Sequence, residues 1–95
     1  MNLEDIRSKA QPILRRYGVE RAAVFGSYAR GDYNEHSDLD LLIYYSPNAK
    51  NTLFTHARLK NELQQLFRKK VDVVTEKAIS PYLRDIILKD MRYIL

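Results

Sequence analysis

The sequence of 95 residues predicts one α/β (α+β) domain, in which a small mixed sheet of three to four strands has helices packed against it. Helical and strand-like segments alternate along the chain, with no linker, repeat or low-complexity stretch between them. Hydrophobic residues make up 45% of the chain and charged residues 29%, as is typical of a folded globular protein. The absence of cysteine excludes a disulfide framework, a thiolate zinc site and a cysteine nucleophile.

The first predicted element is a helix. Apolar residues recur at helical spacing from Leu3 to Tyr17, with Asn2 before them as an N-cap and Gly18 after them as a natural stop. Pro12 lies inside this segment, where proline removes a backbone donor and collides with the preceding turn. The segment is therefore either one kinked helix or two shorter helices.

Two strands are expected next. Residues 21–25 are mostly small and apolar, which predicts a short strand that ends at Gly26 and Ser27, where a turn or a helix begins. Residues 38–45 begin with alternating polar and apolar side chains and end apolar. This pattern predicts a second strand with one wet face in its first half.

The middle of the chain carries loop, helix and strand signals in turn. Residues 46–51 form a loop by composition, and Asn51 is placed to cap the helix that follows. Apolar residues from 53 to 67 line one side of a helix that ends in the basic run 68–70, which suits a helix C-terminus. The β-branched segment 71–75 predicts the third strand.

The last helix begins at a strong start signal. Ser80 is a suitable cap, Pro81 suits the first helical position, and apolar residues continue at helical spacing to Met91. Residues 92–95 either extend this helix or add a short edge strand to the sheet.

Charge is distributed unevenly along the chain. Sixteen basic and twelve acidic residues give a formal charge of +4, which suits an anionic partner such as a nucleotide without identifying it. Residues 32–40 nevertheless hold four acids and no lysine or arginine. These acids are Asp32, Glu35, Asp38 and Asp40. An acidic segment in a basic protein indicates a site that attracts cations.

No segment suggests export or a membrane. The N-terminus carries acids and lacks the apolar block of a secretory signal. The longest apolar run, residues 41–45, is far too short to cross a bilayer. We therefore expect a cytoplasmic protein that does not bind a membrane.

Two of the acids are spaced as a pair on a strand. Asp38 and Asp40 project from the same strand face, with Cβ atoms roughly 6 to 7 Å apart. Alone, this pair would be interpreted as a solvated strand face. Mg²⁺ prefers carboxylate and phosphate oxygens, and two such ions about 4 Å apart are a common device for displacement at phosphorus. Asp72 is the one other acid on a predicted strand, and it is the candidate third ligand.

A glycine-serine turn lies beside the acidic segment. Gly26 closes a strand, so the backbone there can approach a phosphate closely, and the Ser27 hydroxyl at a helix start adds to an anion cradle. On its own, this pair more often forms a simple turn with an N-cap. Arg30 is placed to pair with phosphates or with the acidic segment.

Together these residues resemble the signature of the DNA polymerase beta-like nucleotidyltransferase superfamily, in its short form the minimal nucleotidyltransferase (MNT) domain. The matching pattern is Gly-Ser-x-Ala-Arg-Gly at 26–31, five further residues, and Ser-Asp-x-Asp at 37–40. Asp72 on a later strand extends the resemblance over nearly the whole chain, so residues 1–95 are expected to form a single MNT domain.

The resemblance implies a role for each matching residue. Asp38, Asp40 and Asp72 would be the catalytic residues and would bind two divalent ions, Mg²⁺ or alternatively Mn²⁺. Gly26 and Ser27 would hold the triphosphate of ATP, and Arg30 would support it or the acidic segment. The implied reaction is in-line attack on the α-phosphorus of a nucleoside triphosphate, with transfer of the nucleoside monophosphate and release of pyrophosphate.

The size of the chain limits where the group that accepts the nucleoside monophosphate can come from. Larger members of this superfamily carry an acceptor domain for which 95 residues leave no room. The chain resembles the antitoxins of HEPN/MNT toxin-antitoxin pairs, which transfer AMP from ATP to a tyrosine of the HEPN ribonuclease toxin or simply bind it. A hetero-oligomer with a HEPN toxin, without direct nucleic-acid binding, is therefore implied. The alternatives are a non-catalytic binding antitoxin and a nucleotidyltransferase that acts on a small molecule.

Other polar and aromatic residues have weaker signals. Tyr28 and Tyr33 flank the motif and are candidates to stack on a base, although a boundary role is the more ordinary interpretation. His56 is expected on a helix surface, and the basic run 68–70 favours a solvated helix face over a binding surface.

Overall fold

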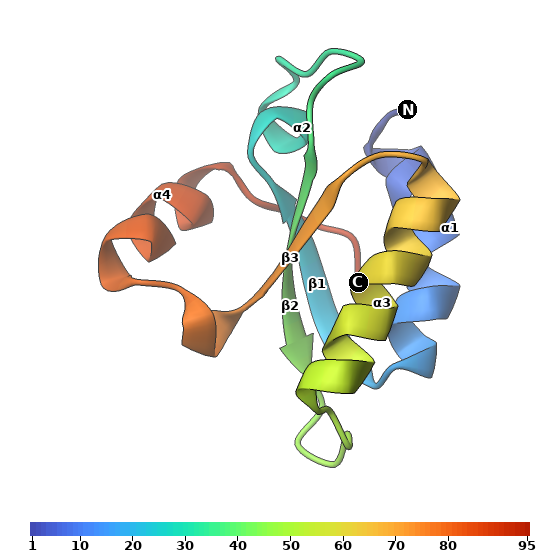
Figure 1. The fold of residues 1–95 in the computed structure, drawn as a ribbon. Helices are drawn as coiled ribbons and strands as arrows, with labels where there is room; N and C mark the ends of the chain where they lie inside the picture. The colour runs from blue at the N-terminus through green and yellow to red at the C-terminus, as the bar shows by residue number, and fades with distance from the viewer.

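The computed structural model describes residues 1–95 as four α-helices, one short 3₁₀ helix and one four-stranded sheet (Figure 1). In chain order, the elements are α1 (Leu3–Arg16), β1 (Val19–Phe25), α2 (Ser27–Arg30), β2 (Leu39–Tyr45), α3 (Leu53–Phe67), β3 (Val71–Thr75), η1 (Glu76–Ala78), α4 (Pro81–Asp90) and β4 (Arg92–Tyr93). None of these helices has both the length and the apolar character that a bilayer crossing requires.

The sheet is mixed, as expected. Its strand order is β3-β2-β1-β4. Strand β1 pairs antiparallel with both β2 and β4, whereas β2 and β3 are parallel. The parallel pair requires a crossover connection, which helix α3 supplies.

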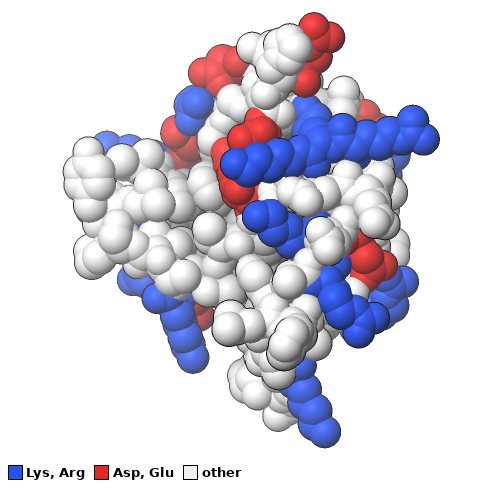
Figure 2. All heavy atoms as spheres, viewed as in Figure 1, with Lys and Arg blue, Asp and Glu red and all other residues white.

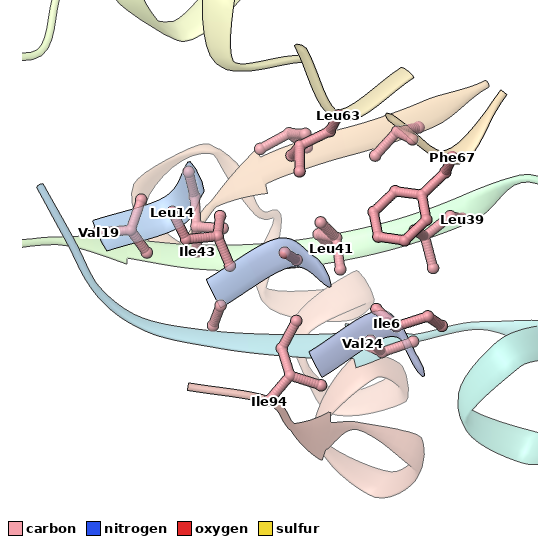
Figure 3. Close-up of a cluster of buried hydrophobic side chains, with 14 of the residues drawn as sticks. Ile6, Leu14, Val19, Val24, Leu39, Leu41, Ile43, Leu63, Phe67 and Ile94 are labelled. Atoms are coloured by element: carbon pink, nitrogen blue, oxygen red, sulfur yellow. The ribbon is translucent and has the colours of Figure 1, made fainter. Parts of the chain in front are cut away.

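Helices cover both faces of the sheet. Helices α1 and α3 lie side by side on one face, and α4 lies on the other (Figure 1). The main core lies under α1 and α3, where alternate residues of β2 meet both helices (Figure 3). Its fully buried residues include Ile6, Leu14, Leu39, Leu41, Ile43, Leu59 and Leu63. A smaller cluster of Leu42, Ile79 and Ile87 lies under α4.

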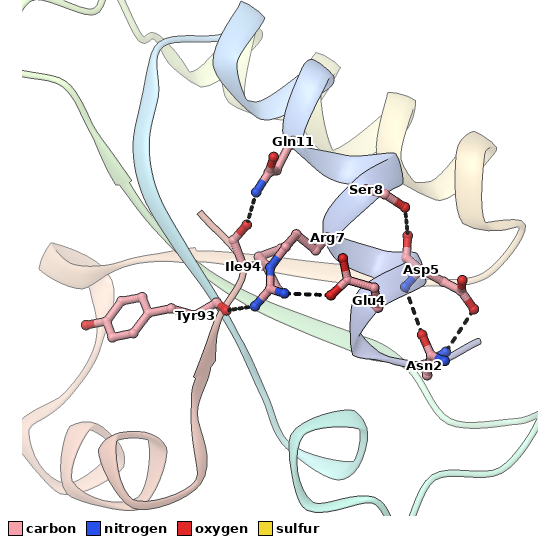
Figure 4. Close-up of polar contacts among 8 residues, drawn as sticks. All are labelled: Asn2, Glu4, Asp5, Arg7, Ser8, Gln11, Tyr93 and Ile94. Atoms are coloured by element: carbon pink, nitrogen blue, oxygen red, sulfur yellow. Dashed lines mark hydrogen bonds and ion pairs between the residues drawn. The ribbon is translucent and has the colours of Figure 1, made fainter.

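Helix α1 is one continuous helix that includes Pro12. Its N-terminus is closed by a capping box, in which Asp5 N–H donates to Asn2 Oδ1 (2.8 Å) and Asn2 N–H donates to Asp5 Oδ2 (3.2 Å) (Figure 4). Burial of Ile6 and Leu14 on its inner face offsets the backbone hydrogen bond that proline cannot make.

The C-terminal residues form an edge strand and do not extend α4. Ile94 is 1% exposed and belongs to the main core. The Arg7 guanidinium donates to the Tyr93 carbonyl (3.0 Å), and the Gln11 amide donates to the Ile94 carbonyl (2.6 Å) (Figure 4). The end of the chain therefore runs from α4 across the sheet edge to α1.

Three expected details of the elements were wrong. Strand β1 begins at Val19, ahead of the predicted start, because an irregularity between Val19 and Arg21 still lets the first residue pair with β2. Strand β2 begins at Leu39, one residue later than predicted. Helix α3 is capped by Thr52 and not by Asn51. Thr52 is the N-cap because its side chain accepts from the Thr55 backbone N–H, while the Thr55 side chain accepts from the Thr52 backbone N–H.

His56 is also not the surface residue that the sequence suggested. It is half-buried, with Nε2 3.1 Å from the Val73 carbonyl and Nδ1 3.0 Å from the Tyr45 hydroxyl. The carbonyl can only accept, so Nε2 carries the proton and donates, and Nδ1 accepts from the hydroxyl. His56 thereby ties α3 to both β2 and β3.

Candidate active site

The three predicted aspartates lie on one face of the sheet, where β2 and β3 begin. Asp40 and Asp72 are direct neighbours in the register of the parallel pair. Leu39 and Leu41 belong to the core under α1 and α3, so Asp40 between them faces the opposite side of the sheet. Asp38 precedes β2 by one residue and lies on the same side as Asp40 by strand alternation.

Helix α4 leaves this part of the face open. The side chains of Asp38 and Asp72 are 45% and 40% exposed. The cavity under α4 is lined mainly by apolar residues and includes none of the three carboxylates. Because a divalent cation needs carboxylate oxygens and not apolar walls, we place the candidate site at the open carboxylates.

Asp40 is the carboxylate in the least favourable surroundings. Burial raises the pKa of Asp40 to about 6, and the charge of Asp72, a hydrogen bond to Asp72 and the charge of Asp38 add to the rise. The positive charge of Arg30 opposes it. A bound cation would favour the ionised form that these surroundings disfavour.

Gly26 lies directly against Asp40. Its backbone angles are φ +75° and ψ −151°, in a region that only glycine occupies readily. A Cβ atom at this position would lie 2.4 Å from Asp40 Oδ2. Both the turn into α2 and the place of the Asp40 carboxylate therefore require glycine here. Ser27 follows as the first residue of α2.

Arg30 contacts acidic residues on two elements. Its Nε donates to Asp32 Oδ2 (3.2 Å) in the acidic segment, and its Nη1 lies 3.7 Å from Asp90 Oδ2 at the end of α4. The hydrogen bond to Asp32 is the largest influence that raises the pKa of Arg30. Arg30 thus joins α2 to the acidic segment and to α4 beside the candidate site.

Two lysines belong to this site although the sequence favoured a solvated helix face for them. The Lys69 ammonium donates to the Tyr28 hydroxyl and to the Ser37 carbonyl (3.0 Å). The Lys70 ammonium lies 4.0 Å from both Asp38 and Asp72. One signal could have revealed them: the basic run directly precedes the strand that carries Asp72, so it must reach the edge where the aspartates lie.

The two tyrosines that flank the motif stack on each other. The ring centroids of Tyr28 and Tyr33 are 4.3 Å apart, and Tyr28 is only 5% exposed. The Lys69 ammonium lies 4.6 Å from the Tyr28 ring centroid. Tyr28 is therefore part of the core, and the suggestion that it stacks on a base was wrong.

The donor set fits a hard divalent cation. Asp38, Asp40 and Asp72 offer only carboxylate oxygens on one face, and burial together with the charges of Asp72 and Asp38 raises the pKa of Asp40. The three are not gathered into a ready-made cage of metal ligands. Instead, a basic side chain crosses the acidic patch at the edge of the sheet, as Figure 2 shows.

The sequence matches known nucleotidyltransferases over nearly its whole length. The family model of the nucleotidyltransferase domain matches residues 6–94. A Methanocaldococcus jannaschii protein named "putative protein adenylyltransferase" is 43% identical over 90 residues, which cover 95% of each chain. The protein adenylyltransferase MntA of Thermococcus cleftensis is 29% identical over 98 residues, which cover 99% of this chain and 97% of MntA.

Solved structures share the fold. One described as a "putative minimal nucleotidyltransferase" is 40% identical and has a TM-score of 0.78, with 97% of this chain and 95% of that chain covered. A toxin-antitoxin structure with AMP-PNP has a TM-score of 0.80 at 20% identity, with 94% and 72% covered. The complex of a tri-AMPylated Shewanella oneidensis HEPN toxin with its MNT antitoxin has a TM-score of 0.74 at 17% identity, with 98% and 71% covered. With this fold and this sequence similarity, the chain belongs to the nucleotidyltransferase domain family.

Proposed function

We propose that this nucleotidyltransferase transfers AMP from ATP to a tyrosine hydroxyl of a partner HEPN ribonuclease toxin and so acts as its antitoxin. The observation that carries the proposal is the pairing of Asp40 with Asp72 on an open sheet face, directly against Gly26. Residues 1–95 act as one domain and need a partner to supply the acceptor. Since ATP and a ribonuclease would meet in the cytoplasm, we place the reaction there.

The comparisons support the choice of nucleotide and partner. A relative that covers nearly the whole chain is named a protein adenylyltransferase. One structure with the same fold is a toxin-antitoxin complex with AMP-PNP, and another holds an AMPylated HEPN toxin. A hetero-oligomer of this chain with a HEPN toxin is therefore the assembly that we propose.

Each site residue has a role in this reaction. Asp38, Asp40 and Asp72 would hold the divalent cations, Mg²⁺ or Mn²⁺, which when bound supply charge neutralisation for the attacking hydroxyl and for the leaving pyrophosphate. Gly26 keeps side-chain bulk away from the phosphates, and Ser27 presents its hydroxyl at the start of α2.

The remaining charged residues position this machinery. Arg30 holds the acidic segment to α2 and to α4, which keeps the chain before β2 in place. Lys69 holds the carbonyl of Ser37, the residue directly before Asp38. Lys69 is therefore a positioning residue, and Arg30 would support the triphosphate or the acidic segment.

Mass spectrometry of the toxin tests the proposal. Purified chain, ATP and MgCl₂ are incubated with the HEPN toxin from the same genome, and we expect the toxin to gain the mass of one or more AMP groups on tyrosine. Asp40→Asn should abolish this gain because it removes a carboxylate from the site. Lys77→Met, an exposed change on η1, should leave it intact.

Two outcomes would contradict the proposal. If the wild type and Asp40→Asn both leave the toxin mass unchanged while both form the complex and suppress its ribonuclease activity, the chain is a binding antitoxin. If the chain instead modifies a small-molecule hydroxyl acceptor without the toxin, the proposed substrate is wrong.

A further inference from the structure

The backbone fixes Lys70 opposite the first aspartate of the site. Leu39 N–H donates to the Lys70 carbonyl (3.0 Å), which extends the parallel β2–β3 pairing by one step. Val71 N–H donates to Gln64 Oε1 (3.1 Å), which anchors the same turn to α3. Strand alternation then places the Lys70 side chain on the face that carries Asp72.

The Lys70 ammonium is shared between two carboxylates. It lies 4.0 Å from Asp38 Oδ2 and 4.0 Å from Asp72 Oδ1, too far for a strong hydrogen bond to either. Its side chain is 61% exposed. In Figure 2, basic side chains lie across the acidic patch at this edge of the sheet. Such loose, solvated ion pairs are weak and can exchange partners at little cost.

The neighbouring Lys69 is held quite differently. Its ammonium has two hydrogen-bond acceptors, Tyr28 and Ser37, and it lies against an aromatic ring. Moving it would leave those groups without a partner. Of the two adjacent lysines, Lys70 is therefore the one that is free to leave its place.

We propose that the Lys70 ammonium is the internal counter-ion of the metal-free site. A divalent cation must displace this ammonium from the carboxylates, and the ammonium then pairs with the nucleotide phosphates. The inference rests on the proposed function, because it assumes that Asp38 and Asp72 bind the cation. A cation that arrives alone has to displace the ammonium and leaves it beside a second positive charge. A cation that arrives with a nucleotide brings phosphate oxygens to which the ammonium can donate. Lys70 thus makes the site prefer the metal-nucleotide complex to the free metal ion.

Binding measurements on the purified chain test this preference without any turnover. Mn²⁺ is titrated into the protein and detected by electron paramagnetic resonance, first alone and then as its complex with a non-hydrolysable ATP analogue. For Lys70→Met we expect Mn²⁺ alone to bind about 3- to 5-fold more tightly, and the Mn²⁺-analogue complex to bind about 5-fold more weakly.

Two matched variants separate charge from other effects. Lys70→Arg keeps the positive charge, and we expect it to retain the preference of the wild type. Lys77→Met removes the same charge from an exposed position on η1, and we expect it to change neither affinity. If Lys70→Met leaves both affinities unchanged, or weakens both equally, the inference is wrong.

The same titrations distinguish this inference from the function beneath it. If wild-type protein binds Mn²⁺ and Asp72→Asn does not, the metal site stands, and the Lys70 variants alone decide the inference. If wild-type protein binds no Mn²⁺ with or without the analogue, both the metal-dependent function and the role of Lys70 are overturned.

Discussion

Gly26 and Asp40 are so close that neither can be changed without affecting the other. Replacement of Gly26 by alanine would put a Cβ atom 2.4 Å from the Asp40 carboxylate and would force alanine into a positive φ of 75°. We expect Gly26→Ala to lower the free energy of unfolding by about 2–4 kcal/mol, measured by urea denaturation, and to abolish AMP transfer.

Gly31 provides a matched control for this substitution. It also has a positive φ, of 88°, but no atom lies within 4 Å of the Cβ position. Gly31→Ala should therefore lower stability only by the backbone term, about 1 kcal/mol. Equal losses for Gly26→Ala and Gly31→Ala would show that the contact with Asp40 does not matter.

Asp40 also makes the stability of the metal-free protein depend on pH. Its pKa is about 6 in the folded protein against an ordinary value of 3.8, so the folded state holds this proton more tightly than the unfolded chain. The stabilisation is fully present below about pH 4 and is lost as the pH rises through about 6. Because the carboxyl is half-exposed and screened by water, we expect the loss to be on the order of 1 kcal/mol.

Thermal denaturation at several pH values measures this effect. Without metal, Asp40→Asn should be more stable than the wild type near neutral pH and should lack this part of the pH dependence. Added Mg²⁺ should stabilise the wild type and leave Asp40→Asn nearly unchanged. A wild type and a variant with the same pH profile would contradict the prediction.

Among the elements, the end of α3 connects most directly to the site. Lys69, directly after the C-cap residue Arg68, donates to Tyr28 of α2 and to the carbonyl of Ser37. We expect Lys69→Met to lower stability by about 1–2 kcal/mol, measured by urea denaturation, because a hydroxyl and a carbonyl lose their charged donor. AMP transfer should decrease as well, since the residue before Asp38 loses its support.

Lys60, which lies on α3 itself, offers the control. It is half-buried and makes no salt bridge, and Lys60→Met should change stability by less than about 0.5 kcal/mol. If Lys69→Met lowers the free energy of unfolding no more than Lys60→Met does, the contacts of Lys69 with α2 and with Ser37 do not stabilise the protein.

Local signals predicted most elements, and the exceptions have physical reasons. The bounds of β3 and the start of α3 were predicted correctly because their β-branched and apolar patterns are uninterrupted, but α3 ends at Phe67 and does not continue into the basic run. The basic run was misinterpreted because Arg68 adopts a left-handed conformation, with φ 54°, which turns the chain out of the helix and towards the site. Helical periodicity carries no information about that change of direction.

The site was predictable in its acids and not in its cations. Asp72 was expected beside Asp38 and Asp40 because it was the one other acid on a predicted strand, and the register pairs it with Asp40. The acidic segment was one of the two partners expected for Arg30, and the ion pair with Asp32 agrees with it; the second partner, Asp90, was not expected because it belongs to the distant helix α4. Contacts between elements far apart in the chain depend on strand order, which local sequence patterns do not determine.

For the molecule as a whole, the C-terminal segment joins the two layers of helices. Ile94 is buried in the core under α1, although it follows α4 on the other face. We expect Ile94→Ala to lower the free energy of unfolding by about 2–4 kcal/mol in urea denaturation, as for other large-to-small changes in a core.

Leu88 on α4 is a suitable comparison. It is 48% exposed, so Leu88→Ala should cost less than about 1 kcal/mol. Similar losses for Ile94→Ala and Leu88→Ala would mean that the C-terminal segment does not hold the two faces together.

The parallel pairing of β2 with β3 also determines when the site can exist during folding. Asp40 and Asp72 come together only when β3 pairs with β2, and α3 lies between these two strands in the chain. A connection of that length closes more slowly than a hairpin. A nascent or partly folded chain therefore lacks the pair of carboxylates. An incomplete chain on the ribosome therefore holds only part of the candidate site until residue 72 has been made and β3 has paired with β2.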